Sequence, residues 1–200
     1  MAKASWVKVN PSSGSGNGTV NVSSTAEHTG RKARTSILTW KAANVENITR
    51  TVSQAGKPEF TNITENVSAP KDGKLITISG ISNSSKLSFR WGAGNLDLEL
   101  PPQYTANSVL TNLNESIAGD PGAIAQYNFS ITIGIPVNSE IVAKTRQLIV
   151  EDESGNDAIC LITSAAGDAY VTVQEGTIEL DYQGTPVSWI VESNTSWTIE

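Results

Sequence analysis

The sequence predicts an all-β protein with two β-sandwich domains, one of which is divided between the two ends of the chain. Three observations support this: short runs in which apolar and polar residues alternate, turn-forming clusters between those runs, and an internal repeat. Alternation with a period of two is typical of strands with one buried face, and Gly, Pro, Asn, Asp and Ser favour turns. Because a sandwich domain takes about 100 residues, a chain of 200 residues has room for two.

The first match of the internal repeat relates the middle of the chain to its C-terminal end. Residues 73–89 align without a gap with residues 184–200, and the glycine and the Ser-Asn pair keep the same spacing in both copies. A repeat of this kind indicates that one structural unit recurs along the chain.

The second match relates the N-terminal part of the chain to the second half of the middle unit. Residues 19–56 correspond to residues 131–167, with Arg34 aligned to Arg146 and small differences in loop length. In chain order, the sequence therefore contains a second half, a complete unit and a first half.

Two domains follow from this order. Residues 1–57 and 174–200 are predicted to form one composite sandwich, and residues 58–173 a complete, divergent one. Half a sandwich exposes an apolar face and unpaired strand edges, so the two terminal halves should pair. Pairing within one chain, with Met1 and Glu200 close together, is the preferred hypothesis, and strand exchange between chains is the alternative.

The elements are assigned from their residue patterns. Strand-like runs recur along the chain at 20–23, 37–40, 96–100, 131–133, 148–150 and 171–173, and clusters of turn residues lie at 11–18, 69–73, 119–122 and 153–157. Helical spacing of Val109, Leu110 and Leu113 predicts one short helix within 105–117. Alternation also predicts a set of inward-facing residues in the middle unit: Ile131, Ile133, Leu148, Val150 and Ile159.

Charge and targeting restrict the partners. The net charge is −6, and the only basic cluster, Arg31–Arg34, is interpreted as a solvated loop, so nucleic acid is not an expected partner. An apolar leader after Met1 and a run of about 18 apolar residues are both absent from the sequence, so we expect no secretory signal and no membrane partner.

Residues suited to catalysis or metal binding are few. His28, the only histidine, is interpreted as a loop residue, and Cys160 as a buried apolar residue rather than a nucleophile. The carboxylates Glu151–Glu153 and Asp157 offer oxygen ligands but lack the spacing of a calcium loop, so a solvated hairpin tip is the better interpretation. We expect no enzymatic activity, no cofactor and no metal.

Five tryptophans are the remaining candidates for binding, because their rings stack on sugars or anchor interfaces. Trp6, Trp189 and Trp197 lie in strand-like runs, which favours core positions. Trp40 and Trp91 are better placed to be exposed, and they are the candidate binding residues for a glycan or a protein partner.

Two parts of the chain resemble the BACON domain, a module common in Bacteroidetes and in the crAss-like phages that infect them. Ser5–Gly16, Thr19–Val22 and Val52–Gly56 resemble the later half of the module, and Ser193–Ile199 resembles its earlier half. In the middle unit the match is degenerate, since Leu96–Pro101 replaces the Trp-x-x-x-x-Pro segment. The resemblance implies immunoglobulin-like sandwiches and, for the family, binding to carbohydrate or mucin.

The resemblance leads to two hypotheses of function. A free-standing pair of such modules without an export signal looks like a structural protein of a phage virion, made in the host cytoplasm, that decorates or reinforces the head. Its expected partners are the major capsid protein or other virion proteins. The alternative is a carbohydrate-binding module that attaches to surface glycans. Fold alone does not choose between the two.

Overall fold

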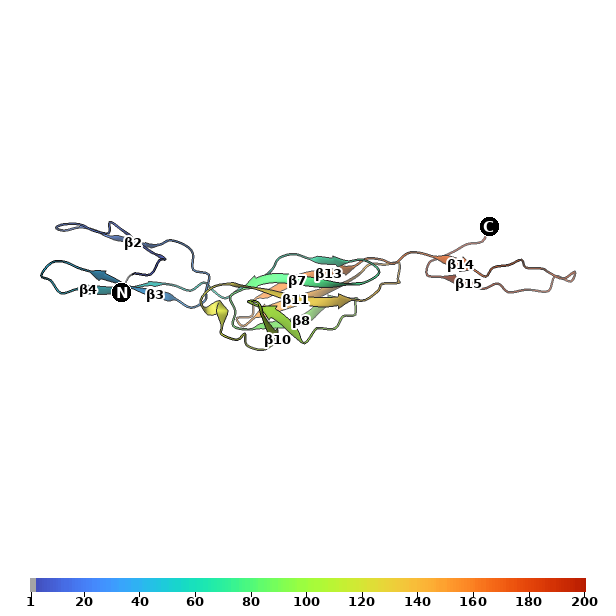
Figure 1. The fold of residues 1–200 in the computed structure, drawn as a ribbon. Coiled ribbons are helices and arrows are strands. Elements are labelled where there is room, and N and C mark those ends of the chain that lie inside the picture. The colour runs from blue at the N-terminus through green and yellow to red at the C-terminus, as the bar shows by residue number, and fades with distance from the viewer. Residues whose placement is uncertain (1–2) are drawn as a thin grey trace.

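The chain is all-β, as predicted, in its computed structural model, which describes residues 3–200. Figure 1 shows an elongated molecule with three parts in line: an N-terminal segment, a central unit and a C-terminal segment at the opposite end. Within residues 3–200 the strands form five separate sheets, and a short 3₁₀ helix, η1 (Pro121–Ala123), lies in one loop. The described residues contain no helix long and apolar enough to span a membrane.

The central unit, residues 58–167, consists of two sheets packed around one core. The first sheet is antiparallel, in the order β10-β9-β11-β7-β5. Its strands are β5 (Thr61–Ile63), β7 (Lys74–Ser82), β9 (Gln103–Ala106), β10 (Val109–Asn112) and β11 (Tyr127–Ile135). The second sheet has the order β6-β13-β12-β8, in which β6 runs parallel to β13. Its strands are β6 (Val67–Ala69), β8 (Leu87–Gly94), β12 (Lys144–Asp152) and β13 (Asp157–Ser164).

The core of the central unit lies between these two sheets. Apolar side chains alternate toward it from β7, β11, β12 and β13. Aromatic rings fill its middle: the centroid of Phe89 lies 4.7 Å from that of Tyr104 and 6.3 Å from that of Phe129, the latter pair edge to face. Burial raises the pKa of Tyr104 to about 12, so this phenol stays neutral.

Four of the five predicted core residues are buried: Ile131, Ile133, Leu148 and Val150. The prediction that Ile159 faces inward is wrong, because 52% of its surface is exposed and its neighbour Cys160 faces the core instead. Residues 158–162 are all apolar, so the sequence does not show which alternate residues face the core. The pairing of β13 with β12 decides which face is buried.

The predicted helix within 105–117 is also wrong. Residues of this stretch form the hairpin β9–β10, in which Val109 pairs with Ala106. Asn107 and Ser108, the two residues between the strands, both have positive φ, at 48° and 65°. Two consecutive residues of this kind make a tight hairpin turn and cannot continue a helix.

The N-terminal segment consists of two hairpins. β1 (Val7–Asn10) pairs with β2 (Asn21–Ser24), and β3 (Arg34–Trp40) pairs with β4 (Ile48–Gln54). Neither hairpin has a further strand partner among residues 3–200, and β2 is exposed along its whole length. The N-terminal segment therefore consists of two strand pairs that do not join into a larger sheet.

The C-terminal segment contains one short pair of strands, β14 (Val171–Val173) and β15 (Val191–Ser193). Because β14 pairs with β15 and not with the central unit, residues 171–173 belong to this segment, and the central unit ends before them. Trp189 and Trp197, expected in a core, are 45% and 48% exposed.

Pairing of the two terminal halves within one chain, our preferred hypothesis, is wrong for this structure. The N-terminal hairpins and the β14–β15 pair lie at opposite ends of the central unit (Figure 1) and form separate sheets. Glu200 is therefore far from β1–β4, and in the described chain both halves lack the strands that would complete them.

The core register can be tested by replacing Ile133 with Ala. Because this side chain is 1% exposed, the loss of packing should lower the free energy of unfolding by about 2–5 kcal/mol. The matched control is Ile159→Ala on β13, which removes the same atoms from an exposed site and should cost less than about 0.5 kcal/mol. Urea denaturation measures both, and equal losses would contradict the register.

Candidate assembly site at the two ends

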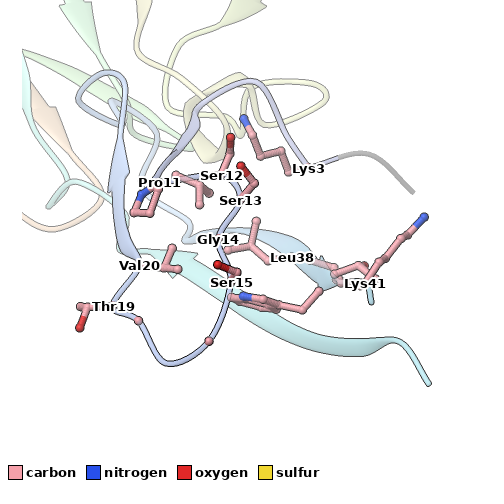
Figure 2. Close-up of a pocket in the computed structure, with 16 residues that line it drawn as sticks. Lys3, Pro11, Ser12, Ser13, Gly14, Ser15, Thr19, Val20, Leu38 and Lys41 are labelled. Atoms are coloured by element: carbon pink, nitrogen blue, oxygen red, sulfur yellow. The ribbon is translucent and has the colours of Figure 1, made fainter. Parts of the chain in front are cut away.

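The open N-terminal end contains a groove between its two hairpins. The groove has a volume of about 740 Å³ and lies between residues 9–20 on one side and residues 37–41 on the other. Figure 2 shows the loop that carries Ser12, Ser13 and Gly14 beside Leu38 of β3. The corresponding space in the central unit, between its two sheets, is filled by the core. The groove is therefore the unfilled interior of a half-built unit.

The hairpin β3–β4 reproduces the hairpin β12–β13 of the central unit. Arg34 pairs with Gln54 as Lys144 pairs with Ser164, a constant separation of 110 positions that holds over the whole ladder. The hydrogen bond from Lys57 N to the Gly30 carbonyl recurs 110 positions later as the one from Gly167 N to the Glu140 carbonyl, which fixes the match at this separation. Arg34 therefore matches Lys144 and not Arg146, two residues away from the pair expected from the sequence. The same register matches Trp40 to the fully buried Val150.

Comparison with the central unit identifies the missing strands. There, β11 has β9 on one side and β7 on the other, and β12 lies between β13 and β8. In the N-terminal segment, β2 has only β1 and β3 has only β4. The positions equivalent to β7 and β8 are therefore empty in both sheets, which leaves two strand edges open.

The C-terminal segment reproduces the first strands of the central unit. Val171 pairs with Ser193 as Thr61 pairs with Ser82, so β14–β15 repeats the β5–β7 register. The hydrogen bond from Gln174 N to the Ile190 carbonyl likewise repeats the one from Thr64 N to Ser79. This segment thus has the conformation of the beginning of a further unit.

A buried asparagine joins the N-terminal segment to the central unit. Asn83 Nδ2 donates to the carbonyl oxygens of Thr29 and Pro58, both at 3.2 Å, and Asn83 Oδ1 accepts from Phe60 N at 2.9 Å. Asn83 is fully buried, so losing these bonds would leave its amide unsatisfied. We call this set of contacts the N-junction.

The same arrangement joins the central unit to the C-terminal segment. Asn194 Nδ2 donates to the carbonyl oxygens of Ser139 at 3.3 Å and Asp168 at 2.9 Å, and its Oδ1 accepts from Tyr170 N at 3.0 Å. Each backbone partner lies 110 positions after its equivalent in the N-junction. This second set is the C-junction, and it shows that successive units follow one another with the same geometry.

Charge strengthens the N-junction. The guanidinium of Arg31 forms two hydrogen bonds to the Asp120 carboxylate, at 2.5 and 2.7 Å, and donates to the Asn83 carbonyl at 3.2 Å. The hydrogen bond with Arg31 lowers the pKa of Asp120 and raises that of Arg31. Arg31–Arg34, interpreted from the sequence as a solvated loop, therefore includes a docking residue. At the C-junction the equivalents of Arg31 and Lys32 are Ile141 and Val142, which are exposed.

The two candidate binding residues have different surroundings. Trp40 is 42% exposed and lines the N-terminal groove. Trp91 lies on β8 opposite Leu148, half-buried against the core of the central unit. The structure does not bring them together, since one belongs to the N-terminal segment and the other to the central unit.

The residues considered for catalysis or metal binding are engaged in local contacts. His28 is buried, and its Nε2 donates to the Lys32 carbonyl at 2.7 Å. Cys160 is buried as predicted, and burial raises the pKa of its thiol. No group of three or more potential metal ligands occurs among residues 3–200.

The acidic hairpin is partly structural rather than wholly solvated. Asp152 is buried, and its carboxylate accepts hydrogen bonds from the backbone N–H groups of Ser154 and Asn156. Arg90 forms ion pairs with Glu151 and Asp157. These carboxylates fix the β12–β13 turn.

Sequence reasoning missed the junction asparagines. The conserved spacing of Ser-Asn in residues 73–89 and 184–200 was the available signal, because Asn83 and Asn194 are those asparagines. Their role depends on backbone groups about 25 and 54 residues away, which spacing alone does not identify.

In comparisons with known proteins, no protein-family model matches the chain, and no curated protein matches it significantly.

The ion pair of the N-junction gives a testable pH dependence. Because Arg31 lowers the pKa of Asp120, the pair stabilises docking above the unfolded carboxyl pKa of about 3.9. This contribution to docking disappears as the pH falls through the lowered pKa of Asp120 in the folded protein. At neutral pH, Asp120→Asn should reduce amide-exchange protection of Arg31 and Lys32, whose N–H groups bond to residues 122 and 123.

The difference in amide-exchange protection between Asp120→Asn and the natural chain should vanish in acid, below the pKa of Asp120 in the folded protein. Glu115→Gln is the control, since Glu115 is exposed and accepts from Asn112 with no cation as partner. A difference that stays constant down to that acid range would contradict the assignment.

Proposed function

We propose that this chain is a non-enzymatic structural protein of a phage virion, built from immunoglobulin-like units, that decorates or reinforces the capsid. The observation that carries the proposal is the presence of a complete unit between two incomplete ends. Open strand edges and exposed apolar faces are features that proteins normally cover, and here they occur at both ends of one elongated molecule. Such ends suit a protein that acts through association.

The chemistry of the side chains supports a non-enzymatic role. His28, Cys160 and Asp152 are buried and hydrogen-bonded, so they are engaged in holding loops and core. The resemblance of Ser5–Gly16 and Ser193–Ile199 to the BACON module supports the link to crAss-like phages. Capsid proteins or other virion proteins are the proposed partners.

Mass spectrometry of purified virions tests this function. For the phage that encodes the chain, we expect it in the mature particle at a copy number that matches the capsid lattice. Recombinant protein should also cosediment with empty capsids, and the control is sedimentation of the protein alone. Absence from the particle, together with no cosedimentation, would rule out the virion role.

Carbohydrate binding is the second candidate, and the N-terminal groove favours it. Trp40 lies in this groove with Ser12, Ser13 and Thr39, a combination of an aromatic ring and hydroxyl groups that suits a sugar. Trp91 offers less ring surface, because it packs against the core.

A glycan array with variants tests this candidate. If the groove binds glycans, Trp40→Ala should abolish binding, and Trp91→Ala should leave it largely intact. Thermal unfolding of both variants controls for folding. If binding is lost only in Trp91→Ala, the glycan site lies on β8 and not in the groove. If the natural chain binds no glycan, the carbohydrate-binding function is excluded.

A further inference from the structure

We propose that copies of this chain associate head to tail, with the C-terminal segment of one copy completing the open N-terminal unit of the next. The C-terminal segment, residues 168–200, is the donor, and the N-terminal segment, residues 3–57, is the acceptor. The proposal concerns the purified chain alone and does not depend on the virion role.

Donor and acceptor together contain counterparts of β5, β7, β9, β11, β12 and β13, and residues 194–200 of the donor reach the beginning of a β8 counterpart. The acceptor lacks the equivalents of β7 and β8, and the donor begins with β14–β15 in the register of β5–β7. The central unit shows how these halves fit, because it contains both halves in one continuous chain. It therefore serves as a template for the contact between two copies.

The template fixes the register in the first sheet. In the central unit Ile78 lies opposite Ile131, and Ile76 lies opposite Ile133. The repeat matches Ile78 to Trp189. In the acceptor strand that corresponds to β11, Val20 and Val22 are the alternating apolar residues, so we match them to Ile131 and Ile133. The contact thus places Trp189 of one copy opposite Val20 of the next and, two residues along, Val187 opposite Val22. All four of these donor and acceptor side chains are exposed in the single chain.

The second sheet gives a consistent register. Phe89 lies opposite Val150 in the central unit, and Trp40 matches Val150. In the gap-free repeat Phe89 matches Glu200, so we shift the match by one residue after Asn194, which places the apolar Trp197 and Ile199 at the inward positions of Leu87 and Phe89. Ile199 of one copy then lies beside Trp40 of the next on the neighbouring strand, and both are exposed in the single chain. Residues 184–200 of one donor thereby supply an apolar segment to each of the two open edges.

Charge complementarity identifies a second copy as the partner. Residues 1–57 contain eight Lys or Arg and two Asp or Glu, a net charge of +6. Residues 168–200 contain six Asp or Glu and no Lys or Arg, a net charge of −6. Opposite charges of equal size on the two segments favour their encounter and oppose contacts between like ends.

The geometry of the chain determines the kind of assembly. Donor and acceptor lie at opposite ends of the central unit, and the two junctions repeat the same contacts. The interface is heterologous, because each copy contributes a different surface. Such contacts extend into an open filament unless rotation between the copies closes a ring.

The test uses two full-length variants, each blocked at one end. Val20→Lys places a charge in the acceptor and leaves the donor intact, whereas Trp189→Lys blocks the donor and leaves the acceptor intact. Analytical ultracentrifugation should show concentration-dependent oligomers for the natural chain and monomers for each variant alone. An equimolar mixture of the variants should form a dimer and nothing larger, because only one functional donor and one functional acceptor remain.

Controls separate this outcome from misfolding and from other contacts. Leu75→Lys changes an exposed residue of the central unit and should assemble like the natural chain. Amide-exchange protection over β11 and β12 should be unchanged in all variants. Because the segments are oppositely charged, raising the salt concentration should weaken the oligomers.

Two results would overturn the proposal. One is a natural chain that stays monomeric at every concentration, in which case a different polypeptide covers the two ends. The other is a mixture that fails to form the dimer while the natural chain associates, in which case another surface is responsible. Crosslinking of Val20→Cys with Trp189→Cys chains checks the register, with Ile190→Cys as the control that points to the opposite face.

Discussion

A strand in a two-sheet β protein needs a neighbour at each buried edge and a covering layer over its apolar face. Residues 58–167 satisfy both needs by themselves, and their core side chains are almost completely buried. β2 and β14 satisfy neither, and they are exposed along their whole length. The open groove and the exposed tryptophans follow from this difference, as does the inference that the two ends associate.

The junction asparagines determine how the three parts of the molecule are arranged. Each side-chain amide binds backbone groups of two units at once, so Asn83 and Asn194 fix how one unit follows the next. At the N-junction, burial and the Arg31–Asp120 pair make separation costly, since a buried amide and a charge pair would lose their partners. The units therefore stand in line, and this separates the termini that the sequence led us to place together.

The sequence predicted the all-β class, the repeat and most of the core, because alternation and spacing are local signals. It did not predict the hairpin at Asn107 and Ser108, where left-handed backbone conformations override apolar spacing. It also placed Ile159 in the core incorrectly, since a run of five apolar residues does not show which of them face inward, and the pairing with β12 decides this. Trp40 was correctly expected to be exposed, yet its environment, an unfilled core position, became visible only in three dimensions.

The position of Trp40 links the two candidate functions of the N-terminal end. It matches Val150, which is fully buried and has β8 beside it in the same sheet, and the donor of a second copy would lie beside Trp40 in the same way. A sugar and a donor strand therefore compete for one groove. Within a filament only the copy at the acceptor end keeps its groove open, so assembly would restrict glycan binding by this residue to one end of the structure.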